Sequence, residues 1–155
     1  MKIREAVEAD MPDVCRLNDV VQRLHATLRP DLYRWPPEEK GRLAILNKAR
    51  IEAAWRLWVA DSDRAIAGYV ATELMKKPET ALRIAHTEGH IHHISVAPNL
   101  RRCGVGGALA RRAIEGLREQ GADRITVGYW TFNEPSRALF ASLGFEPASV
   151  FAELQ

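Results

Sequence analysis

Residues 96–107 combine the residue types best suited to binding an anion, in the order Val-Ala-Pro-Asn-Leu-Arg-Arg-Cys-Gly-Val-Gly-Gly. An apolar strand ends here, a basic loop follows, and the glycines lead into an amphipathic helix. The first turn of a helix has N–H groups without intrahelical partners, and the helix dipole adds about half a positive charge there. Glycine lets an anion approach the backbone closely, and Arg101 and Arg102 add full charges. The segment therefore predicts a diphosphate site.

Three phosphate-binding patterns compete for this segment. A Walker loop requires Gly-Lys-Ser/Thr, which is absent. The dinucleotide fingerprint, started at Gly104, places Leu109 where a small residue is needed. The third pattern, Arg-x-x-Gly-x-Gly, is met by Arg101, Gly104 and Gly106. In this respect the segment resembles the acetyl-coenzyme A signature of the GNAT N-acetyltransferase superfamily, which reads Gln/Arg-x-x-Gly-x-Gly/Ala.

The resemblance continues downstream, where Asn133, Ser136, Phe140 and Gly144-Phe145 follow the family's spacing. It implies a single N-acetyltransferase domain over residues 1–155. The implied fold is α/β, a mixed, centrally splayed sheet of six to seven strands with helices on both faces. It also implies acetyl-CoA as co-substrate, an amine of a small molecule or peptide as acceptor, and a possible homodimer.

The same resemblance assigns residues to acetyl-CoA. The Val96 N–H would donate to the thioester carbonyl, and a bulge near this point would free backbone groups for the pantetheine arm. The implied cofactor-binding residues are Ile94, Ser95, Val96, Arg101, Arg102, Cys103, Gly104, Val105, Gly106, Gly107, Asn133, Ser136 and Phe140.

Two histidines precede this segment at strand spacing. An alkyl ammonium has a pKa near ~10.4, so a base is useful, and histidine has a suitable pKa. Period-2 alternation places His90 and His92 on one face and His93 on the other. We therefore expect His92 to be the main base, or the head of a water relay, with His90 behind it.

A metal site is the competing interpretation of these histidines. It would need the strand to reach back to His86 and Glu88. We expect a loop there and hence no metal.

Phe140 departs from the family pattern, because many members carry a tyrosine there that protonates the leaving thiolate. Tyr129 and Ser136 are alternative donors, or the thiolate leaves unassisted. The departure also keeps open a non-catalytic acyl-CoA-binding or sensing domain.

The acceptor site is less well defined by the sequence. Candidate acceptor contacts are His25, Tyr33 and Trp35, in the connector that overhangs the acceptor site in the resembling fold. Polyamines, arylalkylamines, aminoglycosides, amino acids and protein N-termini all remain open.

Hydrophobic spacing predicts the elements that position these groups. A polar loop is expected over 76–88. Strands are expected over 3–7, 55–60, 65–75, 89–96 and 125–130, with one or two more in 145–154. Helices are expected from Asp10 to before Pro30, from Pro36 to about Ala53, from Gly104 to about Gly121, and from Pro135 to before Gly144. This order favours a mixed sheet with helices on both faces.

Amino-acid composition narrows the range of protein types and binding partners. The chain has 155 residues, 46% of them hydrophobic, which is typical of one globular domain. Its 22 basic and 20 acidic residues give a net charge of only +2, which argues against nucleic acid or an anionic membrane as partner. The two cysteines form no disulfide framework, and no apolar run approaches the roughly 18 residues of a membrane span, so we expect a cytoplasmic protein.

Overall fold

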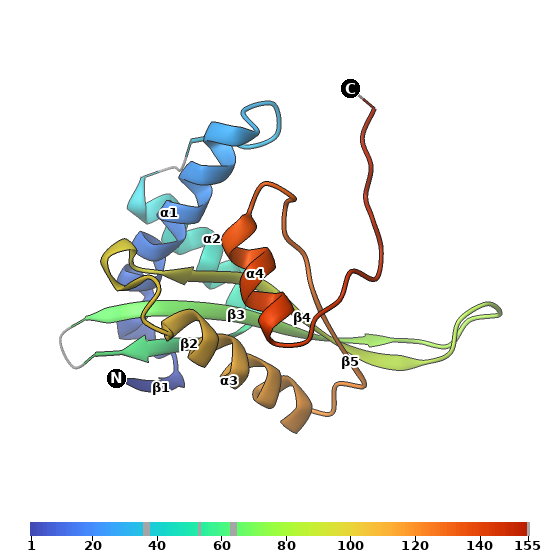
Figure 1. Ribbon diagram of the computed structural model, residues 1–155. Coiled ribbons are helices and arrows are strands. Elements are labelled where there is room, and N and C mark those ends of the chain that lie inside the picture. The colour runs from blue at the N-terminus through green and yellow to red at the C-terminus, as the bar shows by residue number, and fades with distance from the viewer. Residues whose placement is uncertain (36–37, 53, 63–64, 155) are drawn as a thin grey trace.

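A mixed sheet lies at the centre of the computed structural model, which describes residues 1–35, 38–52, 54–62 and 65–154 (Figure 1). Its first four strands are antiparallel neighbours, and β4 and β5 run parallel. A parallel pair needs a crossover, which a helix supplies here. The strands lie in the spatial order β1 (Lys2–Glu5), β2 (Arg56–Asp61), β3 (Ile66–Lys77), β4 (His86–Val96) and β5 (Arg124–Val127).

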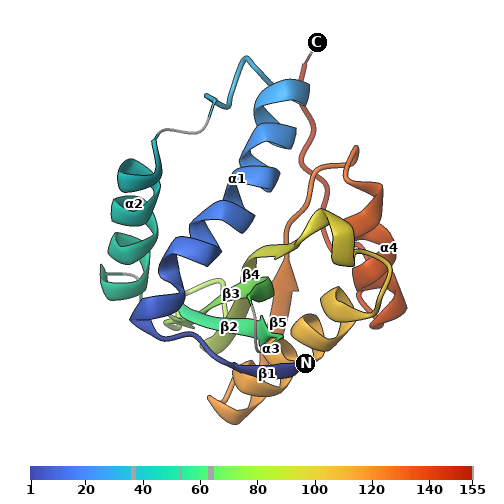
Figure 2. The same ribbon diagram turned by 90° about the vertical axis from the view of Figure 1, so that its left-hand side faces the viewer.

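Helices cover both faces of this sheet, as expected. Helices α1 (Met11–Leu28) and α2 (Glu39–Glu52) lie on one face (Figure 2). Helices α3 (Val105–Glu119), the crossover, and α4 (Glu134–Ser142) lie on the other. The expected helix boundaries at Pro36 and Ala53 fall outside the described residues.

Strand alternation divides the buried side chains between two cores. The core under α1 and α2 contains Met11, Val14, Leu46, Val59 and Tyr69. The core under α3 and α4 contains Val70, Ile91, Leu109, Leu117 and Phe140. Burial of these large side chains supplies the main driving force for folding. No helix among the described residues has the length and hydropathy that a bilayer span would need.

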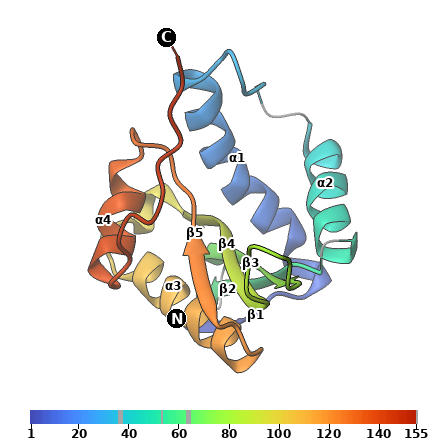
Figure 3. The ribbon, with the colours of Figure 1, turned by 90° about the vertical axis from the view of Figure 1, so that its right-hand side faces the viewer.

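The sheet splays open between β4 and β5, as Figure 3 shows from the side of β5. These strands pair only from Glu88 with Arg124 to Ile91 with Val127. A β-bulge lies in β4 at the same level, because His93 pairs with Ala71 whereas Ile91 pairs with Thr72, which leaves His92 as the extra residue. The expected splay and bulge are therefore confirmed.

The strand count is lower than expected: the described residues form five strands rather than six to seven. Residues 145–154, where further strands were expected, form none. Pro147 cannot donate to a ladder, and an ion pair of 2.8 Å between Glu153 and Arg29 holds the end of this segment beside α1.

The loop expected over 76–88 is confirmed only for residues 78–85, and its ends are wrong. Lys76 pairs with Thr87 and Lys77 with His86, so β3 and β4 extend into a long hairpin that projects from the body (Figure 1). Backbone hydrogen bonding sustains a ladder whose side chains are polar. The hydrophobic pattern therefore gave no sign of these strand ends.

Candidate active site

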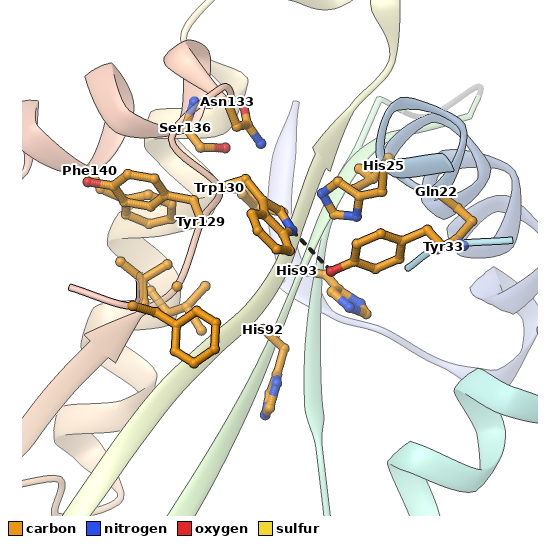
Figure 4. Close-up of a pocket in the computed structure, with 16 residues that line it drawn as sticks. Gln22, His25, Tyr33, His92, His93, Tyr129, Trp130, Asn133, Ser136 and Phe140 are labelled. Atoms are coloured by element: carbon orange, nitrogen blue, oxygen red, sulfur yellow. Dashed lines mark hydrogen bonds between the residues drawn. The ribbon is translucent and has the colours of Figure 1, made fainter. Parts of the chain in front are cut away.

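A cavity of about 440 Å³ lies where β4 and β5 diverge (Figure 4). Strand β4 contributes one side, the chain after β5 a second, and α1 with its following connector a third. Of the residues singled out by the sequence, the cavity is lined by His25, Tyr33, His92, Ile94, Tyr129, Asn133, Ser136 and Phe140. The gap thus brings together residues from distant parts of the chain.

Backbone groups of β4 face this gap beyond the last β4–β5 pair. The Ala97 N–H donates to the Ala67 carbonyl at 2.9 Å. In an antiparallel ladder, N–H groups alternate between the two sides of a strand. The N–H groups of Val96 and Ile94 therefore point away from β3, into the gap.

Ser95, unlike Ile94 and Val96, directs no backbone group into the gap. Its hydroxyl is buried and donates to the Leu17 carbonyl of α1 at 2.8 Å. Its backbone faces β3, where it pairs with Tyr69. Of the three β4 residues expected to hold the cofactor, Ile94 and Val96 present backbone groups to the gap and Ser95 does not.

The glycine-rich segment forms a turn at the start of α3. Arg102 and Gly104 have positive φ angles of 64° and 81°, both in the left-handed region that favours glycine, and the sequence supplies a glycine at the second position. The first intrahelical bond runs from the Ala108 N–H to the Gly104 carbonyl at 3.0 Å. The N–H groups of the preceding helical residues thus lack intrahelical partners.

This helix start lies beside the gap. A Cβ atom on Gly106 would be 3.7 Å from Val96 Cγ2 and 3.6 Å from Leu139 Cδ2 of α4. Arg101 and Arg102 are exposed, as is Cys103, and neither arginine forms an ion pair with any residue that the structure describes. Val105 is buried and anchors the first turn in the core. Free N–H groups and two unpaired cations here fit a bound diphosphate.

His92 is held in the cavity by two contacts. Its Nε2 lies 2.7 Å from Glu73 Oε2, and its ring stacks on Trp55 with centroids 4.1 Å apart. Engagement of Nε2 leaves Nδ1 for a substrate. His92 can therefore act as a base whose orientation is fixed by a carboxylate.

His90 lies behind His92, outside the lining of the cavity. The two rings are edge to face with centroids 4.7 Å apart, and His90 Nδ1 lies 2.8 Å from Thr126 Oγ1 of β5. Burial lowers the pKa of His90, and the neighbouring His92 adds to this effect. At neutral pH His90 is an uncharged hydrogen-bonding group.

The expected position of His93 on the opposite face is wrong. Both His92 and His93 have ring contacts with Trp55, because the bulge interrupts period-2 alternation. Burial lowers the pKa of His93 to about 4, with smaller contributions from His92 and His25. Its Nδ1 atom is buried and has no hydrogen-bond partner among the described residues.

Aromatic side chains form the wall opposite β4 (Figure 4). The Trp130 Nε1–H donates to the Tyr33 hydroxyl at 3.0 Å, and the His25 ring lies 4.8 Å from the Tyr33 ring. Trp35 lies outside the cavity lining, is 58% exposed, and stacks under the Arg23 guanidinium. Of the three candidate acceptor contacts, His25 and Tyr33 reach the cavity.

The family comparison agrees with this geometry. The profile of the Acetyltransferase (GNAT) family matches residues 21–145. The chain belongs to the GNAT acetyltransferase family. The described residues contain no group of three His, Cys, Asp or Glu side chains that could hold a metal ion.

Curated relatives of this GNAT chain are acetyltransferases. A mycothiol acetyltransferase from Beutenbergia cavernae is 33% identical over 99 residues, which is 63% of this chain and 30% of that protein. N-acetyltransferase 8F1 from Rattus norvegicus is 25% identical over 104 residues, which is 67% of this chain and 45% of that protein. The chain thus spans less than half the length of either relative.

Solved structures share the GNAT fold along the whole chain. A mutant of the BH1408 protein from Bacillus halodurans has a TM-score of 0.91 at 24% identity, covering 100% of this chain and 99% of that one. The aminoglycoside antibiotic 6'-N-acetyltransferase AAC(6')-IG from Acinetobacter haemolyticus has a TM-score of 0.75 at 21% identity, covering 100% and 97%. At these identities the likeness establishes the fold alone.

The α4 residues of the GNAT pattern lie beside the cavity. Asn133 caps α4, because its Oδ1 accepts the Ser136 N–H at 3.3 Å. Phe140 is 1% exposed and lies parallel to Tyr129, with ring centroids 6.1 Å apart. Tyr129 thus brings a hydroxyl to the region where the family tyrosine is missing.

Sequence reasoning missed Glu73, Trp55 and Trp130. Glu73 and Trp55 become neighbours of His92 only through strand register, which no local pattern reveals. Trp130 lies in the segment just after β5, which ends at Val127, and its place beyond a strand that borders the gap was a usable signal.

Proposed function

We propose that the chain is an acetyl-CoA-dependent N-acetyltransferase that transfers an acetyl group directly to a primary amine of a small molecule or peptide. One observation carries the proposal: β4 carries the His92 imidazole in the cavity and, beyond its last pair with β5, the Val96 N–H that points away from β3, and the start of α3 lies beside Val96. In this proposal the start of α3 binds the acyl carrier, the Val96 N–H polarises the thioester carbonyl, and His92 accepts the proton of the amine.

The residues at the gap fit the carrier. The α3 N–H groups with Arg101 and Arg102 suit its diphosphate. The exposed edge of β4 at Ile94 and Val96 suits an extended amide arm, which would add to the sheet like a strand. Acetyl-CoA supplies an acetyl group activated as a thioester, and the Val96 N–H would stabilise negative charge on its carbonyl oxygen.

The acceptor must lose a proton before it can attack. With a pKa near ~10.4, only about one alkyl amine in a few thousand is neutral at pH 7. His92 would take this proton on Nδ1 while Nε2 stays bonded to Glu73. His90 and Thr126 lie behind it as uncharged hydrogen-bonding groups.

The leaving thiolate has candidate proton donors in Tyr129 and Ser136, which both line the cavity. A thiol pKa near ~8.5 also permits departure without a donor.

A cytoplasmic location and a homodimer stay predictions, as does the absence of nucleic acid and membrane partners.

Calorimetry with coenzyme A, together with release of free thiol from acetyl-CoA in the presence of amines, tests the proposal. We expect binding that weakens about tenfold or more in the Arg101→Ala/Arg102→Ala variant and is unchanged in Arg83→Ala at the exposed tip of the β3–β4 hairpin. Absence of binding would refute the proposal. Binding without thiol release for every amine would instead indicate a non-catalytic acyl-CoA-binding or sensing domain.

A further inference from the structure

The acceptor side of the cavity carries no fixed charge. None of the described residues that line the cavity is Asp, Glu, Lys or Arg. Two of the three histidines that line the cavity, His25 and His93, have pKa values lowered by burial, so they are neutral at pH 7. The Glu73 carboxylate, which lies outside the lining, is engaged by His92.

Arg29 lies close to this wall but brings no free charge to it. Its guanidinium sits 4.7 Å from the Trp130 ring centroid. It is paired with Asp31 at 2.7 Å and with Glu153 at 2.8 Å. Its charge is therefore balanced by carboxylates outside the cavity lining.

The polar groups of Trp130 and Tyr33 contact each other. The Trp130 Nε1–H donates to the Tyr33 hydroxyl, and this bond uses the only polar group of the indole. Gln22, which also lines the cavity, donates its amide to the Arg34 carbonyl at 2.8 Å. What this wall offers an acceptor is mainly ring surface.

We infer that the acceptor is a monoamine with a flat aromatic body, bound against the rings of His25, Tyr33 and Trp130 with its amine at His92. This inference rests on the proposed function. Aromatic pairs contribute about 0.5–1.5 kcal/mol beyond the burial of their area, which corresponds to roughly a 2- to 12-fold preference for a flat ring over an aliphatic chain of similar size.

The same wall disfavours the other amine classes. A polyamine or aminoglycoside would bring additional ammonium groups into a lining without a carboxylate, and burying an unpaired charge costs several kcal/mol. An amino acid would bring a carboxylate that no lining Arg or Lys can pair. A single ammonium is compatible, because it gives up its proton to His92.

The test measures kcat/KM by thiol release for 2-phenylethylamine, hexylamine, spermidine and phenylalanine. Phenylalanine is 2-phenylethylamine with a carboxylate added, and spermidine adds charges to an aliphatic chain. We expect 2-phenylethylamine to exceed spermidine and phenylalanine by at least about 100-fold, and hexylamine by several-fold. Equal or faster turnover of spermidine or phenylalanine would overturn the inference.

Substitutions in the aromatic wall test whether Trp130 and Tyr33 bind the acceptor. Trp130→Leu and, separately, Tyr33→Leu should raise the KM for 2-phenylethylamine about tenfold while the affinity for acetyl-CoA is unchanged. Trp35→Leu, which removes an exposed tryptophan outside the cavity lining, is the matched control and should change neither. An unchanged KM in both wall variants would refute the site.

Coenzyme A calorimetry on the same preparations separates the two levels of failure. If acetyl-CoA does not bind, the proposed function itself fails. If acetyl-CoA binds but 2-phenylethylamine is acetylated no faster than spermidine, only the acceptor inference fails.

Discussion

Glu73 and His92 form a hydrogen-bonded pair across neighbouring strands, with Glu73 Oε2 2.7 Å from His92 Nε2. Both side chains are partly buried. The bulge in β4 turns His92 toward this carboxylate and toward Trp55. An irregularity in the sheet thereby positions the candidate base.

Replacing His92 tests its role as the base. General-base catalysis contributes about 10²- to 10⁴-fold to rate, so His92→Gln should lower kcat/KM for the amine by that order and remove the acidic limb of its pH profile. His86→Gln, at the outer end of the same strand, is the control and should resemble wild type. A pH profile that His92→Gln leaves unchanged would show that His92 is not the base.

Replacing Glu73 tests a positioning role. Glu73→Gln keeps a hydrogen-bonding side chain but removes the carboxylate that holds His92 Nε2 at 2.7 Å. We expect kcat/KM for the amine to fall about tenfold because the imidazole is less well positioned, with the KM for acetyl-CoA unchanged. Glu79→Gln on the hairpin tip is the control. A loss of thermal stability with an unchanged kcat/KM would mean that Glu73 is only structural.

The parallel rings of Tyr129 and Phe140 suggest that one hydroxyl can replace the other. Tyr129→Phe should lower kcat several-fold, and the Tyr129→Phe/Phe140→Tyr double variant should recover part of the loss. Phe140→Tyr alone should retain activity and is expected to raise kcat if a hydroxyl at this position can protonate the thiolate. A large drop in its kcat would show that the apolar slot around Phe140 tolerates no hydroxyl.

Local sequence patterns predicted the glycine-rich turn before α3, because a strand end, a basic loop and glycines are adjacent in the chain. They could not predict the Glu73–His92 pair, whose members are 19 residues apart and meet through strand register. The same limitation explains His93, since period-2 alternation holds only until an extra residue is inserted. Residues 145–154 show the converse, because their apolar residues predict strands but form none, and the Glu153–Arg29 ion pair holds the end of this segment beside α1.

The stability of the protein at acidic pH tests whether burial lowers the pKa of His93. Its pKa is about 4 in the folded protein and near ~6.5 in an unfolded chain, so between these values the unfolded state binds more protons. The free energy of unfolding should therefore decrease as pH falls from 6.5 towards 4, with about 3 kcal/mol as an upper bound for this residue. Urea titrations of wild type and His93→Phe at pH 4.5, 5.5 and 6.5 measure this slope.

The His93→Phe variant should lose less stability over that pH range than wild type, whatever its stability at pH 7. The slope should not vanish, because burial also lowers the pKa values of His25 and His90. Identical slopes in the two proteins would mean that folding does not lower the pKa of His93. In that case His93 would gain a positive charge below about pH 6.5, and acetylation of an ammonium-bearing acceptor would weaken there, because this charge lies beside His92.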